Sequence, residues 1–112
     1  MIYAAIGLFA VAAIFGLFNL KNVIAKKEIP RGVVYSHGLF AATALVLLMI
    51  YAIQSPAHYP LVSIVLFVIA AVGGFYMLFR DLTKKTIPVG IAGLHAVLAV
   101  AGFIMLLLFA FS

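Results

Sequence analysis

Four long apolar blocks dominate this chain and leave it few ways to fold. They cover residues 2–20, 33–53, 61–79 and 89–111. Each block is close to the ~20 residues that a helix needs to cross the ~30 Å hydrocarbon layer of a bilayer. Lipid offers the backbone no hydrogen-bond partner, so helices are the expected form of each span. Hydrophobic residues make up 69% of the sequence and charged residues 8%, a balance that excludes a soluble domain of this size.

The two halves of the chain repeat one another. The pattern Lys-Lys-x-Ile-Pro-x-Gly, followed by a histidine and then an alanine, begins at position 26 and again at position 84, an offset of 58 residues. In each copy a basic loop leads through a proline, which a first helical turn tolerates, into an apolar helix. The repeating unit is therefore an αα-hairpin, with halves at about residues 1–54 and 59–112.

These features predict an all-α fold, a transmembrane four-helix bundle built from two tandem helical-hairpin repeats. It forms a single integral membrane domain, residues 1–112, with a pseudo-two-fold axis along the membrane normal. The predicted helices run from Ile2 to Leu20, with a frayed turn to Ala25, from Pro30 to Ile53, from Leu61 to Phe79, and from Pro88 almost to Ser112.

The basic residues indicate how the chain lies in the membrane. All seven lysines and arginines fall between the first and second blocks or between the third and fourth, and residues 54–60 contain none. The positive-inside rule then places both basic loops in the cytoplasm and both termini on the exterior side, as in a bacterial inner membrane. Topology thus accounts for the net charge of +5, and we expect the lipid bilayer, not a nucleic acid, as partner.

Two histidines occupy matching places in the repeat. His37 lies seven residues after Pro30, and His95 seven residues after Pro88, which puts each roughly 10 Å along its helix at 1.5 Å per residue. An ionisable side chain at such a depth favours a functional role. The small residues one turn on, Ala41 and Ala99, leave a slot beside each imidazole. The competing interpretation is close helix packing, with each imidazole bonded to a neighbouring carbonyl.

The two histidines suit some ligands better than others. Zinc prefers three or four ligands, and no carboxylate or cysteine lies near them in the sequence. The methionines do not match across the repeat, which weakens the case for copper. Haem iron needs two axial ligands, which two opposed imidazoles would supply. The haem propionates would require cations at the nearer interface, where Arg31 and the loop lysines lie.

The pattern resembles the cytochrome b proteins of respiratory membranes. These carry haem-ligating histidines on the second and fourth helices of a four-helix bundle, and glycines on the first and third. Here His37 and His95 match the ligands, and Gly16 and Gly74 match the glycines that make room for the porphyrin. The resemblance implies one b-type haem near the cytoplasmic side, used for electron transfer or haem handling, with a quinone or a redox protein as partner.

The chain departs from that family at its second haem site. The family has a further histidine about four turns along each ligand helix, where this sequence has Tyr51 and Phe109. The resemblance therefore implies a one-haem form of the pattern.

Other functions remain open at the level of sequence. A cofactor-free small subunit or an assembly factor of a larger membrane complex is the main alternative, and a homodimer is compatible with the sequence. A small exporter is less favoured because coupling requires a buried carboxylate, and no span contains one. No catalytic triad or hydrolytic metal site is apparent, and His58, in the loop at residues 54–60, is expected to be solvated.

Overall fold

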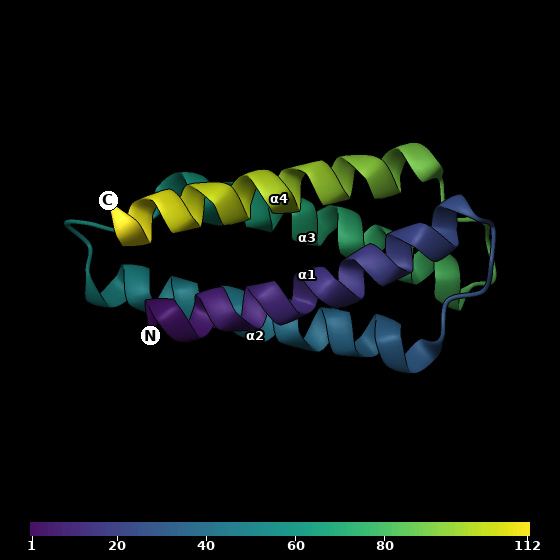
Figure 1. Ribbon diagram of the computed structural model, residues 1–112, viewed down its shortest axis with the longest axis horizontal. Coiled ribbons are helices and arrows are strands. Elements are labelled where there is room, and N and C mark those ends of the chain that lie inside the picture. Colours follow the sequence, from purple (N-terminus) through teal and green to yellow (C-terminus); the bar gives the residue numbers. More distant parts are fainter.

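The computed structural model describes residues 1–112 and consists of four helices without strands (Figure 1). They are α1 (Ile2–Ile24), α2 (Arg31–Gln54), α3 (Leu61–Leu82) and α4 (Val89–Phe111). All four are long and apolar enough to cross a membrane, and the bundle measures 44 × 23 × 20 Å. The predicted all-α transmembrane bundle is thus confirmed, and the four apolar spans are those of an integral membrane protein.

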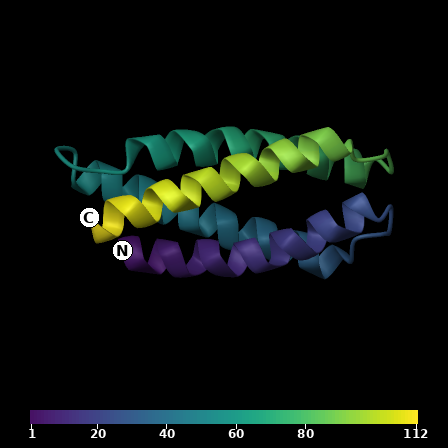
Figure 2. The ribbon, with the colours of Figure 1, turned by 45° about the horizontal axis from the view of Figure 1, so that its top comes forward.

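The helices form a ring in which the backbone of each one packs along two others. α1 packs along α2 and α3 along α4, as the hairpin repeat predicts, while α1 also meets α4 and α2 meets α3. Consequently α1 and α3 face each other across the bundle axis, and so do α2 and α4 (Figures 1 and 2). Both termini and the turn between α2 and α3 lie at one end, here called the terminal end. The loops of residues 25–30 and 83–88 form the opposite, basic end.

The helix α3 runs beyond its predicted end at Phe79 to Leu82, and α1 is regular helix to Ile24 through the turn that was predicted to fray. The apolar pattern stops earlier because the last turn of each helix carries a basic residue, Lys21 in α1 and Arg80 in α3, and Nε of Arg80 donates to the Thr86 carbonyl at 2.6 Å. Each backbone stays helical until a closing turn supplies N–H groups that donate hydrogen bonds to the last carbonyl groups of the helix.

Both helix ends use the same closing turn, the Schellman motif. After α1, the Lys27 N–H donates to the Asn22 carbonyl at 2.9 Å, and Lys26 adopts a φ of 56°. After α3, the Lys85 N–H donates to the Arg80 carbonyl at 2.8 Å, and Lys84 adopts a φ of 58°. Glycine is the usual residue in this left-handed conformation. The paired lysines of the repeat therefore occupy a strained backbone turn in both copies.

The best-packed part of the interior lies in the half towards the terminal end. There the rings of Phe9 and Phe67, equivalent residues of the two repeats, stack across the axis with centroids 3.9 Å apart and planes at 7°. Ala5, Ala44 and the equivalent residues Leu48 and Leu106 are completely buried around them; the last three belong to α2 and α4. Most other large apolar side chains point outwards, as expected for helices surrounded by lipid.

Candidate functional site

The two repeated histidines meet inside the bundle. His37 lies in the second turn of α2 and His95 in the second turn of α4, the two helices that face each other across the axis. Their ring centroids are 6.0 Å apart, and the ring planes are inclined by 76°. The pseudo-two-fold symmetry thus turns the histidines towards each other at equivalent depth in the basic half of the bundle.

Each imidazole is anchored to the other helix of its own hairpin. The Nδ1 atom of His37 lies 2.7 Å from the carbonyl oxygen of Ala12, and that of His95 lies 2.7 Å from the carbonyl oxygen of Ala70. A carbonyl oxygen can only accept, so the hydrogen of each neutral ring must sit on Nδ1. The Nε2 lone pair of both rings is therefore the one available to a ligand. This carbonyl bond agrees with the packing interpretation, and it is also the partner that metal-bound histidines ordinarily have.

Gly16 and Gly74 lie directly against these rings. A Cβ atom added to Gly16 would stand 2.9 Å from Cε1 of His37, and one added to Gly74 would stand 3.2 Å from Cε1 of His95. A Cβ on Gly7, which has no glycine partner in the repeat, would meet nothing within 4 Å. The paired glycines thus give the imidazoles the space that lets them reach the Ala12 and Ala70 carbonyls. Whether they also make room for a porphyrin, as the resemblance implies, is a separate prediction.

The small residues that follow the histidines have different surroundings. Ala41 and Ala99, one turn on, are half-buried. One turn further, Ala44 is completely buried, and the space beside Gly102 is filled by the ring of Phe67, which would lie 3.2 Å from an added Cβ. The Phe67 ring therefore fills the interior beside Gly102, two turns beyond His95.

Arg31, predicted to lie near haem propionates, is already engaged with a carboxylate. Its Nη1 atom lies 3.0 Å from Oδ2 of Asp81, and this ion pair joins the start of α2 to the end of α3. The two side chains are 47% and 26% exposed, so the pair contributes little to stability. The internal repeat does not predict this ion pair, because the positions equivalent to Arg31 and Asp81 hold Val89 and Val23.

One polar group near the histidines was not singled out by the sequence pattern. Asn19 lies one turn from Gly16 towards the basic end, and its Oδ1 atom is buried without a hydrogen-bond partner. The equivalent residue of the second repeat is Met77, so symmetry could not identify it. The Oδ1 atom of Asn19 is therefore an unsatisfied hydrogen-bond acceptor in the basic half of the bundle.

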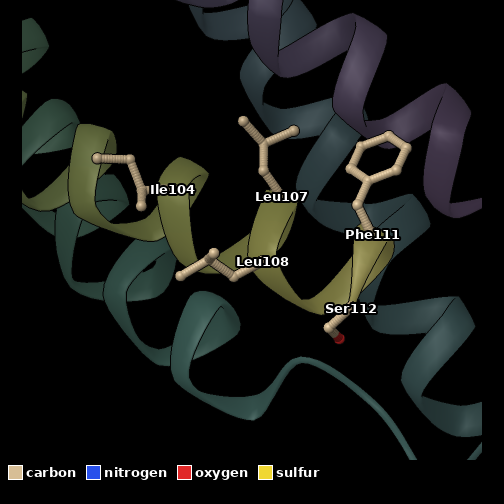
Figure 3. Close-up of a pocket in the computed structure, with 5 residues that line it drawn as sticks. All are labelled: Ile104, Leu107, Leu108, Phe111 and Ser112. Atoms are coloured by element: carbon tan, nitrogen blue, oxygen red, sulfur yellow. The ribbon is translucent and has the colours of Figure 1, made fainter.

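The terminal end has no second pair of facing histidines, although the buried Oγ of Ser63 in α3 also lacks a hydrogen-bond partner. His58 is exposed, as predicted, and its ring lies 4.5 Å from that of Phe109 between centroids, while Tyr51 packs edge to face on the same phenylalanine at 6.2 Å. A shallow hollow of about 390 Å³ lies on the last turns of α4, lined by apolar side chains and Ser112 (Figure 3). It lies far along α4 from His95. No group of three or more histidine, cysteine or acidic side chains is arranged to hold a metal ion.

No model of a known protein family, no curated protein and no solved structure matches this chain. The functional assignment therefore rests on the histidine site and its surroundings.

Proposed function

We propose that the chain is a small membrane cytochrome of the b type, with one haem between α2 and α4 and with His37 and His95 as its axial ligands. The observation that carries this proposal is the symmetrical anchoring of the two imidazoles. Both rings are held by an Nδ1 hydrogen bond of 2.7 Å, both keep Nε2 for a ligand, and their centroids are 6.0 Å apart. Two imidazoles at this separation are within reach of a single iron ion, and two nitrogen ligands complete the coordination of a haem.

When bound, the haem would supply one-electron transfer through its iron. The residues of the chain would hold and tune it. The carbonyl bonds from Ala12 and Ala70 fix the orientation of each imidazole and make its Nε2 more basic, which strengthens a metal–nitrogen bond. Gly16 and Gly74 permit this ring placement. The apolar helices around the site exclude water, and a site of low polarity shifts the reduction potential of a charged iron centre.

The position of the histidines favours exchange of electrons at the basic end. Only the first turns of α2 and α4 separate them from that end, whereas the phenylalanine stack fills the axis towards the terminal end. By the positive-inside rule the basic end lies in the cytoplasm and the termini lie outside. A quinone or a redox protein would then deliver or take the electron on the cytoplasmic side. Tyr51 and Phe109, packed edge to face, occupy the places of a second ligand pair.

Optical spectroscopy of the purified protein tests this function. We expect a Soret band and the spectrum of a low-spin, six-coordinate haem, which His37→Ala and His95→Ala should each abolish. His58→Ala serves as the matched control and should leave the spectrum unchanged, because that ring lies in an exposed loop at the terminal end. All variants should be compared on monodisperse samples of equal helix content. A wild-type protein that takes up no haem, even when haem is added during purification, would favour the cofactor-free subunit.

A further inference from the structure

A polar cleft opens between the two loops at the basic end of the bundle. Its volume is about 840 Å³, and its walls come from residues 28–31, which lead into α2, and from Asp81 and residues 84–86, which follow α3. No residue of α1 or α4 contributes to it. The cleft therefore sits on one side of the bundle, at the seam between α2 and α3, where these spans reach the level of the lipid head groups.

The charges in the cleft leave two cations without a partner. Arg31 pairs with Asp81, which is the only ion pair in the structure, and Lys84 and Lys85 make no side-chain hydrogen bond or ion pair. Glu28 also lines the cleft, so that three cations face two carboxylates. Because Asp81 uses one oxygen on a single Arg31 nitrogen, the remaining guanidinium N–H groups stay available. The cleft can thus present ammonium and guanidinium donors to one anion.

We propose that this cleft binds the phosphate of an anionic membrane lipid, with Lys84 and Lys85 as the main contacts and Arg31 as the third. Lysine and arginine are the side chains that bind phosphate oxygens most strongly. Cationic pockets between spans at the membrane surface are known to select anionic head groups. Acyl chains would continue down the outer faces of α2 and α3, where exposed apolar residues such as Leu82 and Leu39 lie. This site is independent of the proposed haem.

The internal repeat provides a matched control. Lys26 and Lys27 are the equivalents of Lys84 and Lys85, with the same sequence, the same closing turn and nearly the same backbone angle, φ 56° against 58°. They lie outside the cleft. A general attraction of basic loops to anionic lipid would weaken equally when either lysine pair is neutralised. A specific site would respond to only one of them.

The test is a titration of phosphatidylglycerol into the protein in neutral detergent, read out as bound lipid by native mass spectrometry. Each lysine near an anionic head group contributes about a factor of five to binding, so Lys84→Gln with Lys85→Gln should weaken it roughly 30-fold. Lys26→Gln with Lys27→Gln should change it less than about two-fold, since these lysines do not line the cleft. Equal losses in the two double variants, or equal binding of zwitterionic phosphatidylcholine by the wild type, would overturn the proposal.

Two further arms identify the ligand and its contacts. Asp81→Asn removes a negative charge and releases Arg31, so it should tighten phosphatidylglycerol binding, whereas a loss of binding would contradict the assigned role of Arg31.

Glycerol phosphate, added as a competitor, separates a lipid from a soluble phosphate ester. Failure to displace the lipid at millimolar concentration would assign the site to the lipid. Displacement of the lipid at that concentration would keep the phosphate site but assign it to soluble esters.

Discussion

In each half of the bundle interior the pseudo-two-fold symmetry brings a pair of equivalent aromatic or imidazole rings to the axis, but the two pairs differ in polarity and in spacing. In the terminal half, α1 and α3 send Phe9 and Phe67 to the axis, where the rings stack at 3.9 Å. In the basic half, α2 and α4 send His37 and His95 to the axis, and the rings stay 6.0 Å apart with their planes nearly perpendicular. Helices α1 and α3 therefore meet at the axis through an apolar pair in the terminal half, and α2 and α4 meet there through a polar pair in the basic half.

The two pairs also differ in the groups that surround them. The phenylalanines are enclosed by side chains that the bundle itself provides, among them the fully buried Leu48 and Leu106. The histidines bond only through Nδ1 and stand against glycines, and the Nε2 atom of each ring makes no hydrogen bond within the chain. The terminal half is thus a packed interior that specifies the fold. The basic half keeps two ring nitrogens without a hydrogen bond, and the proposed function would use them.

The largest effect is expected from breaking the phenylalanine stack. Phe67→Ala should destabilise the folded bundle by roughly 2 kcal/mol or more, below the ~3–5 kcal/mol typical of Phe→Ala in soluble cores. The cost is lower because lipid solvates an exposed ring nearly as well as the interior does, which leaves mainly lost packing. Phe75→Ala, on the same helix and 68% exposed, is the control and should change stability little. Unfolding in mixed micelles, followed by circular dichroism, measures both variants.

Equal stability of the two variants would show that the phenylalanine stack does not hold the terminal half of the bundle together.

The glycines of the basic half should be the next most sensitive. Gly16→Ala places a Cβ 2.9 Å from Cε1 of His37, and such overpacking typically costs ~1–3 kcal/mol. Gly74→Ala should cost less, because the corresponding distance is 3.2 Å. Gly7→Ala, with open space, should gain up to about 1 kcal/mol of helix propensity. The same unfolding assay ranks the three variants, and haem content per protein shows whether the ring displacement also reaches the proposed ligands.

A gain in stability for Gly16→Ala equal to that for Gly7→Ala would show that His37 moves aside without cost. In that event the glycines would not be needed to position the imidazoles.

The smallest effect concerns the basic end, where the repeated turns hold lysine in a left-handed conformation. That conformation costs a residue other than glycine about 1–2 kcal/mol, and glycine gives back part of the gain through its greater freedom in the unfolded chain. Lys26→Gly should therefore stabilise the protein by about 0.5–1 kcal/mol. Lys27→Gly, which replaces a residue without a positive φ, should bring no gain. A loss of stability in Lys26→Gly would mean that the lysine side chain matters more than the strain of its backbone.

Much of the architecture could be predicted from residue pattern because the membrane limits the choices. The apolar blocks became α1 to α4, and the repeat predicted the hairpin pairs that pack together. The helix ends were less predictable, since α1 and α3 finish through backbone hydrogen bonds of the Lys26 and Lys84 turns, which no apolar pattern records. The Arg31–Asp81 ion pair was missed for a related reason. It joins residues 50 positions apart that have no counterpart in the other repeat.

Some properties of the histidine pair follow from the sequence, and others follow only from the tertiary structure. The sequence by itself determined that His37 and His95 are equivalent and equally deep, because a constant offset and a helical rise are local properties of the chain. Only the tertiary structure decided that the two rings face each other, that Nδ1 is used on Ala12 and Ala70, and that the glycines touch the rings. These contacts depend on the rotation of each helix about its own axis. Packing between helices sets that rotation, and no local pattern in the chain contains it.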